Sequence, residues 1–297
     1  DLPLNVSREI LQHNKAIDSI RSASTKKILG MIEKLAKGES YQEFWNNFGR
    51  VLKEGIVEDS TNQEQIAKLL RFDSTHEDSA PGAVSLEQYV ERMIEGQDDI
   101  YYLTAENLAT AKSSPHLEIF NKKGIEVLLL CDPIDEWLVS HLTNFAEKSL
   151  KSVLHGELNL PGDEANEDDQ SKDEKADEGV EEIITKIKDV LGEAVKDVRA
   201  SARLTQSPSC LVSDDQDMSA NLQRILKASG QEIPDAKRIL EVNPDHALVN
   251  RLTETEDQQA FEKLAYILLD QAALVENGRL EDPSAFVNRI NELLLNG

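Results

Sequence analysis

The sequence predicts a mainly helical α+β protein that is built from two parts. Apolar residues recur at helical spacing near both ends of the chain, and the apolar run at residues 127–131, within residues 125–131, is typical of a buried strand. Residues 161–179 are acidic and contain no large apolar side chain, so they are predicted to form a flexible linker. A chain of 297 residues, of which 39% are hydrophobic, is long enough to form two cores.

The first part, residues 1–160, is predicted to begin with a layer of helices over residues 7–70. Its apolar residues recur every three or four positions, with Ser7 placed to cap the first helix and Gly38 placed to end it. Gly55 is placed to end the second helix. The predicted helices cover residues 7–37, 41–52 and 63–70.

A small α/β layer over residues 84–155 is predicted to follow. Ser85 and Gln88 have the spacing of a capping box, which opens a short helix. Thr104 is placed to cap a later helix, Gly124 is placed to end another, and Cys131 is expected to be buried in a strand. The predicted strands cover residues 99–103 and 125–131, and the predicted helices between them cover residues 104–111 and 115–122.

The turn at residues 132–137 follows the second predicted strand, where ligands gather in α/β layers. We interpret Asp132 and Asp135 as caps of the next helix rather than as ligands of a substrate. Trp137 has two interpretations, since it could pack beneath that helix or serve as an anchor for a protein partner.

The second part, residues 180–297, is predicted to be an α+β domain. A helix at residues 180–191 precedes a short β hairpin made by residues 197–204 and 209–213. An amphipathic helix at residues 217–228 then carries an apolar stripe, which is most often core. The alternative is an adaptable surface for partner proteins, for which methionine is well suited. The stripe consists of Met218, Leu222, Ile225 and Leu226.

The last two predicted helices, residues 254–276 and 283–295, form a hairpin whose apolar stripes are wider than two helices can bury against each other. We therefore predict that a second copy of the chain covers them in a two-fold four-helix bundle. The alternative is that the hairpin packs onto the rest of its own domain. The predicted dimer interface comprises Phe261, Leu264, Leu268, Ala272, Val275, Phe286, Ile290, Leu293 and Leu294.

Composition and motifs argue against several classes of function. The net charge of −24 disfavours binding to nucleic acid or to an anionic membrane, and no apolar run approaches the roughly 18–20 residues of a membrane span. Cys131 and Cys210 lie in unrelated contexts, which indicates a reducing compartment and a cytoplasmic location. Nucleophile, phosphate-loop and metal-binding motifs are absent, so we expect neither a complete active site nor a metal.

Arg8 is a candidate for binding an anion. A cation at the start of a helix is unfavourable to the helix dipole, so Arg8 would suit an anionic ligand such as a phosphate. From the residues alone, the alternative is an exposed arginine that pairs with Glu9 or another neighbour.

Segments along essentially the whole chain resemble the ninety-kilodalton heat-shock protein chaperones, most closely the bacterial HtpG type. They occur in the order found in that family, which is far more specific than any single motif. The strings that carry the resemblance include Asp1-Leu2-Pro3-Leu4-Asn5-Val6-Ser7-Arg8-Glu9, Ile100-Tyr101-Tyr102-Leu103-Thr104, Lys123-Gly124-Ile125-Glu126-Val127-Leu128, Asp132-Pro133-Ile134-Asp135-Glu136, Arg203-Leu204-Thr205-Gln206-Ser207-Pro208, Met218-Ser219-Ala220-Asn221-Leu222 and Asn243-Pro244-Asp245-His246.

The resemblance implies an ATP-dependent, dimeric, cytoplasmic chaperone that binds non-native client proteins, with a cognate co-chaperone system as a further partner. This chain would be the distal middle domain and the C-terminal dimerisation domain, with the nucleotide-binding domain outside it. The full-length parent is then implied to use ATP with Mg. For this chain, the resemblance implies neither a cofactor nor enzyme activity. Arg8 is implied to reach the γ-phosphate, with Gln12 supporting it. Implied client contacts are Glu136, Trp137, Met218, Leu222, Ile225 and Leu226.

Two other functions fit parts of the sequence. An acidic interaction scaffold without a chaperone cycle would use the linker at residues 161–179 to bind basic partners. A hydrolase or transferase that used Arg8 and Asp132 would also need a nucleophile or a cofactor loop, and the sequence supplies neither.

Overall fold

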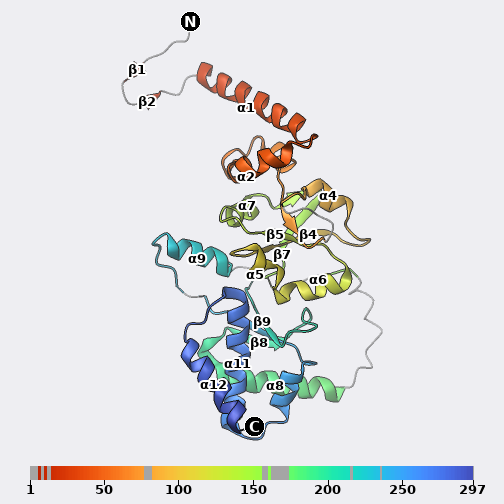
Figure 1. The fold of residues 1–297 in the computed structure, drawn as a ribbon, viewed down its shortest axis with the longest axis vertical. Coiled ribbons are helices and arrows are strands. Elements are labelled where there is room, and N and C mark those ends of the chain that lie inside the picture. The colour runs from red at the N-terminus through yellow and green to blue at the C-terminus, as the bar shows by residue number, and fades with distance from the viewer. Residues whose placement is uncertain are drawn as a thin grey trace.

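The computed structural model describes residues 6–7, 10–11, 15–76, 82–155, 160–161, 174–214, 217–234 and 236–296. It confirms the mainly helical α+β class. Two small mixed sheets, each with its own helices, follow one another along an elongated molecule, with the helix α1 at one end and the hairpin of α11 and α12 at the other (Figure 1).

The first helix begins later than predicted. Ser7 does not cap it, because β1 (Val6–Ser7) pairs antiparallel with β2 (Ile10–Leu11), and this pairing keeps the backbone extended. Helix α1 spans Lys15–Leu35.

Helix α2 (Tyr41–Glu58) runs through Gly55 instead of ending there, and α3 (Gln63–Ala67) follows it. The glycine serves close packing between these two helices, because a Cβ at Gly55 would lie 3.1 Å from the side chain of Ile66. Gly55 therefore permits close packing of the two helices and does not end α2.

The sheet of the first part has five strands in the order β3-β5-β4-β7-β6. Its three central strands are parallel, and the strands at both edges run antiparallel to their neighbours. The sequence indicated β4 and β5 but not β7, in which Leu150 is the one apolar residue. The strands are β3 (Asp73–Ser74), β4 (Asp99–Thr104), β5 (Leu128–Leu130), β6 (Asn144–Phe145) and β7 (Lys148–Ser152).

Short helices surround this sheet. The predicted capping box is present, since the Ser85 hydroxyl accepts from the Gln88 amide at 3.1 Å and the Ser85 amide donates to the Gln88 side chain at 2.9 Å. The predicted stop at Gly124 is also present, with φ at 68°, but Asn107 rather than Thr104 caps the helix after β4. These helices are α4 (Leu86–Glu91), α5 (Leu108–Lys112), η1 (Pro115–Leu117), α6 (Glu118–Lys123) and α7 (Asp135–His141).

Asp132 and Asp135 do not cap α7 with their side chains, so this interpretation was wrong. Ile134 occupies the N-cap position, while both carboxylates bind the ammonium group of Lys53 from α2. The Lys53 nitrogen lies 2.9 Å from Asp132 and 2.8 Å from Asp135. Because Lys53 and Asp135 are buried, a charged cluster joins the helical layer to the α/β layer.

The sheet of the second part has three strands in the order β8-β10-β9. The predicted hairpin is therefore wrong: β10 (Ile239–Val242) lies between β8 (Asp197–Ala200) and β9 (Ser209–Val212). It runs parallel to β8 and antiparallel to β9. A charged residue, Glu241, lies inside β10, which weakens the apolar pattern that would have revealed this strand.

Helices α8 and α11 pack onto this sheet, and α12 packs along α11. Helix α8 begins at Glu174, within the predicted linker, of which residues 162–173 lie outside the described part of the chain. The four apolar clusters of the described residues each draw on one side of that segment only. The helices of the second part are α8 (Glu174–Leu191), η3 (Gly192–Ala194), α9 (Ala220–Ala228), α10 (Ala247–Thr253), α11 (Gln258–Asn277) and α12 (Pro283–Asn296).

Candidate functional site

The residues predicted to contact nucleotide, Arg8 and Gln12, lie outside the described residues. Within the part of the chain that is described, no group of three or more metal-ligating side chains occurs, and no helix is both long and apolar enough to span a membrane. The described candidate residues instead form surfaces at α9 and at the C-terminal hairpin.

The structure brings the Glu136 turn and helix α9 together. Glu136, at the start of α7, is buried and accepts hydrogen bonds from the Ser219 hydroxyl at 2.9 Å and from the Asn221 amide at 2.8 Å. Ser219 also caps α9 by accepting from the Leu222 amide at 3.0 Å. Both oxygens of Glu136 thus hold the first turn of α9. Trp137, the next residue of α7, is half-buried.

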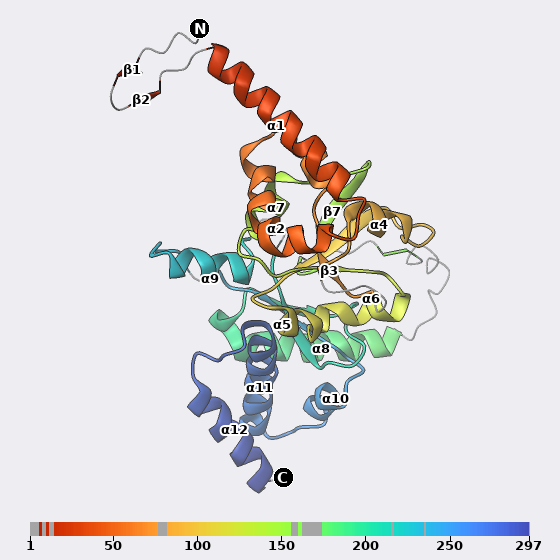
Figure 2. The same ribbon diagram turned by 45° about the horizontal axis from the view of Figure 1, so that its top comes forward.

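Helix α9 presents its apolar stripe at the surface rather than in a core. Met218 is 46% exposed, and the other three stripe residues are only partly buried. The one buried residue of the helix is Gln223, whose side chain donates to the Met218 carbonyl at 3.2 Å. Helix α9 projects from the side of the molecule in both views (Figure 1 and Figure 2). None of the four residues belongs to a buried core, so the more common core interpretation is wrong, and the interpretation as a surface for partner proteins stays a prediction.

The C-terminal hairpin is covered by its own domain over part of its predicted interface. Phe261, Leu264, Leu268 and Ala272 are buried in the core that α11 shares with β9 and β10, so they cannot meet a second copy directly. This corrects the prediction for those four residues, because the sheet supplies the cover that the sequence did not reveal. Phe286, Ile290 and Leu293 are partly buried. The exposed apolar residues of the hairpin are Leu274, Val275, Val287, Leu294 and Leu295.

A joint between the two parts is formed by residues that the sequence did not single out for this role. The Glu118 carboxylate, at the start of α6, accepts from the backbone amides of Thr205, Gln206 and Ser207 at 2.6, 2.7 and 3.0 Å. The Ser207 hydroxyl adds a bond of 2.5 Å. Burial alone would raise the pKa of Glu118, but these hydrogen bonds outweigh it and hold the pKa below its usual value.

Arg203 forms the second element of the joint. This buried side chain donates to the carbonyls of Val153 and His155 in the first part, at 2.6 and 3.0 Å. It also pairs with buried Glu241 of β10, at 2.9 Å. The string that contains Arg203 and Ser207 carried part of the family resemblance, and the structure gives it a position between the two sheets.

Helix α9 is held at a fixed place on the first part of the chain. Glu136 accepts a hydrogen bond from Ser219, and Arg224 of the helix pairs with Glu106 at 3.2 Å. The helix thus presents partly exposed apolar side chains at a defined position on the surface.

Comparison with known proteins identifies the family of this chain. The family model described as Hsp90 protein matches residues 1–297. Chaperone protein HtpG of Pseudoalteromonas translucida is 53% identical over 297 residues, which is 99% of this chain and 46% of that protein. HtpG of Legionella pneumophila is 54% identical, over 99% of this chain and 47% of that protein, and HtpG of Idiomarina loihiensis is also 54% identical, over 100% and 46%. The chain thus spans about half the length of these relatives. It belongs to the Hsp90 family.

Proposed function

We propose that this chain is the client-binding and self-associating half of an ATP-dependent chaperone. The relatives are named chaperone proteins, and the chain belongs to the same family, which supports a chaperone role. The observation that supports client binding is the apolar stripe of Met218 and α9: Met218 is exposed, Leu222, Ile225 and Leu226 are only partly buried, and a glutamine takes the buried position of the helix. Non-native proteins expose apolar segments, and partly exposed Met218 and Leu222 offer flexible contacts to them.

Client binding is tested with the double variant Met218→Ser/Leu222→Ser. We expect its affinity for a permanently unfolded protein, measured by fluorescence anisotropy, to fall at least tenfold, which corresponds to about 1.4 kcal/mol. A loss of that size is reasonable because each apolar side chain buried in a complex contributes about 1.5–3 kcal/mol. The thermal unfolding midpoint should change little, since Met218 is exposed and Leu222 only partly buried.

The matched control is Ile28→Ser/Met31→Ser on α1, where both side chains are more than half exposed. The control variant should retain wild-type affinity. If it weakens client binding as much as the α9 variant does, binding is not localised at α9 and the assignment is wrong.

Self-association is the second component of the proposal. The exposed apolar residues Val287, Leu294 and Leu295 lie on α12, which the chain's own core covers on one side only. A second copy related by a two-fold axis would bury these residues, as in a four-helix bundle. The interface proposed here is thus narrower than the apolar stripes of the hairpin and centres on α12.

Light scattering measures this association directly. The wild-type chain should have twice the chain mass of 33.2 kDa, and Val287→Asp/Leu294→Asp should have the single-chain mass. Val51→Asp, at an exposed apolar position of α2, should leave the doubled mass unchanged. A single-chain mass for the wild type at high protein concentration would rule out the interface.

Nucleotide chemistry is proposed for the full-length parent only. ATP with Mg would bind residues outside this chain, Arg8 would contact the γ-phosphate and Gln12 would support it. A cytoplasmic location and a cognate co-chaperone system belong to the same proposal, which rests on the relatives' being HtpG chaperones.

A further inference from the structure

Helix α9 is held in place by hydrogen bonds rather than by apolar packing. The four apolar clusters of the described residues include no residue of α9, and its one buried side chain is that of Gln223. Along the chain, α9 lies between β9 and β10, which both belong to the second part. Its polar contacts with Glu136 and Glu106 nevertheless attach the helix to the first part. The position of α9 thus depends on a few polar side chains.

The carboxylate of Glu136 makes the more buried of these two attachments. Glu136 is 7% exposed, and its two oxygens accept hydrogen bonds from Ser219 and from Asn221. Ser219 is the N-cap of α9, so the negative charge lies at the N-terminus of the helix, where the helix dipole favours it. A client protein would meet little of this carboxylate, because the residue is buried and both oxygens already have partners on α9.

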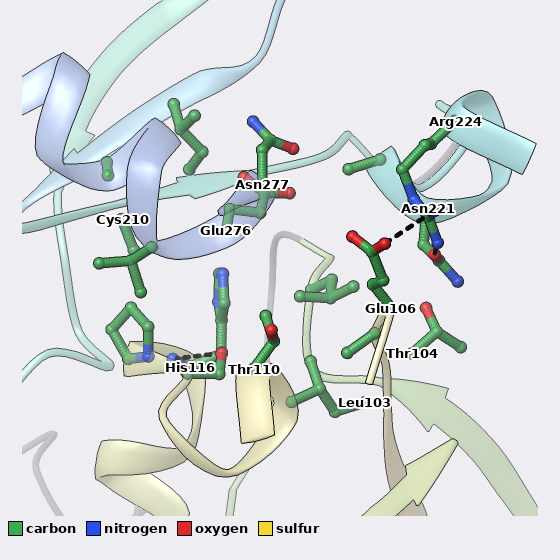
Figure 3. A pocket seen from close by; sticks show the side chains of 18 residues that line it. Leu103, Thr104, Glu106, Thr110, His116, Cys210, Asn221, Arg224, Glu276 and Asn277 are labelled. Carbon is green, nitrogen blue, oxygen red and sulfur yellow. Dashed lines mark hydrogen bonds and ion pairs between the residues drawn. The ribbon is translucent and has the colours of Figure 1, made fainter. Parts of the chain in front are cut away.

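Arg224 fixes the orientation of the Asn221 amide. One guanidinium nitrogen of Arg224 donates to Asn221 Oδ1 at 2.8 Å, and another pairs with Glu106 of the first part at 3.2 Å. Figure 3 shows Arg224 and Glu106 pointing toward each other, with Asn221 beside Arg224 on α9. Because Arg224 engages the oxygen of Asn221, the amide directs its N–H group toward Glu136. The network from Glu136 through Asn221 to Arg224 therefore has a fixed donor and acceptor at each step.

The pair between Arg224 and Glu106 contributes less to this attachment than Glu136 does. The two side chains of the pair are 38% and 54% exposed, and ion pairs at such exposure contribute little because water screens them. Hydrogen bonds to a buried carboxylate are stronger, and breaking one leaves a buried polar group without its partner.

We propose that Glu136 is a positioning residue for α9 and not a client contact. It fixes the helix, and with it the apolar stripe, on the first part of the chain before a client arrives. This role of Glu136 rests on the proposed client binding at α9. A helix that is already fixed loses less conformational freedom when a client binds it, so the attachment to Glu136 raises client affinity without touching the client.

Exchanging donor and acceptor between Glu136 and Asn221 tests this role. Asn221→Asp places a second carboxylate against the carboxylate of Glu136, which should release the first turn of α9. When Glu136→Gln is added, the glutamine amide donates to the introduced carboxylate, whose other oxygen still accepts from Arg224. The double variant Glu136→Gln/Asn221→Asp should therefore restore the attachment that the single variant loses.

Two quantities are measured at pH 8, which disfavours a proton shared between two carboxylates. Asn221→Asp should bind a permanently unfolded protein at least threefold more weakly than the wild type does. Without client, its Gln223 amide, which donates to the Ser219 carbonyl at 3.1 Å, should exchange hydrogen at least fivefold faster. Both values should return to within twofold of the wild type in the double variant with Glu136→Gln. The thermal unfolding midpoint should change little, because α9 lies outside the apolar clusters of the described residues.

Two further variants control for charge and for the added carboxylate. Glu106→Gln removes the same charge from the exposed attachment of the same helix, so it should change affinity and exchange less than twofold. Glu136→Ala removes both acceptors and adds no charge, so it should speed exchange at Gln223 as Asn221→Asp does.

A direct client contact of Glu136 predicts the opposite sign, because Glu136→Gln would then weaken binding further in the Asn221→Asp variant. That result, or wild-type exchange at Gln223 in Asn221→Asp, would overturn the proposal. Failure of the proposed function is distinguishable from this outcome. If Met218→Ser/Leu222→Ser keeps wild-type client affinity, client binding at α9 is wrong, while the exchange measured without client still decides whether Glu136 holds the helix.

Discussion

Replacing Lys53 with methionine is expected to lower the free energy of unfolding of the first part by about 3–5 kcal/mol. Among the described residues, Lys53 is the cation that pairs with Asp135, whose side chain is 1% exposed, so the substitution leaves that buried carboxylate without this counter-ion. Lys53 also lies 5.1 Å from the ring centroid of Phe72, so the variant loses a cation–π contact as well. Urea unfolding followed by tryptophan fluorescence measures the loss.

Arg50→Met is the matched control for this experiment. Arg50 pairs with Asp132 at 2.7 Å, but its side chain is 79% exposed, so the variant should lose no more than about 1 kcal/mol. Adding Asp135→Asn to Lys53→Met should recover part of the loss, because the double variant no longer buries an unpaired carboxylate. Equal losses for the lysine and arginine variants would show that burial of the pair is not the cause.

Replacing Arg203 with methionine should lower the unfolding free energy by a similar amount, about 3–5 kcal/mol, and should also loosen the joint. The variant leaves Glu241 with the partly exposed Arg199 as its remaining cation and removes the donor from two carbonyls of the first part. Hydrogen exchange should become faster at the amide of Ser213, which donates to the Leu154 carbonyl across the joint at 3.1 Å.

Arg199→Met tests whether position or charge matters. It removes an arginine from the same carboxylate, yet it should cost no more than about 1 kcal/mol. Arg199 is partly exposed, and among the described residues its hydrogen bonds go to Glu241 rather than to a carbonyl of the first part. Exchange at Ser213 should then stay at the wild-type rate. Faster exchange in both arginine variants would mean that loss of charge on Glu241, and not the link to the first part, controls the joint.

Local signals in the sequence predicted local structure well. The capping box at Ser85 and the helix stop at Gly124 are where the sequence indicated them, because each depends on neighbouring residues only. The prediction that Gly55 ends a helix was wrong because the role of this glycine is contact with Ile66 of the next helix, which no local pattern encodes.

Most features of the fold that were not predicted depend on pairings between residues far apart in the chain. No local pattern indicates that β10 separates β8 from β9, or that Lys53 meets Asp135 across 82 residues. The hairpin illustrates the consequence, since its stripe through Leu264 and Leu268 was assigned to a second copy while the sheet of its own domain covers it. The client contacts that the resemblance implies at α9 stay a prediction, and the structure shows only that Met218 is exposed and that the other stripe residues are partly buried.

The hydrogen bonds of Glu118 with the backbone of residues 205–207 have a mechanical consequence. A carboxylate that accepts hydrogen bonds from three consecutive backbone amides resists rotation of one part relative to the other more than a single ion pair does. Rotation in any direction stretches at least one of these bonds. Torque applied at the α1 end of the molecule would therefore reach the far hairpin as a turn of the whole second part. The two apolar surfaces, at α9 and at α12, would then turn together.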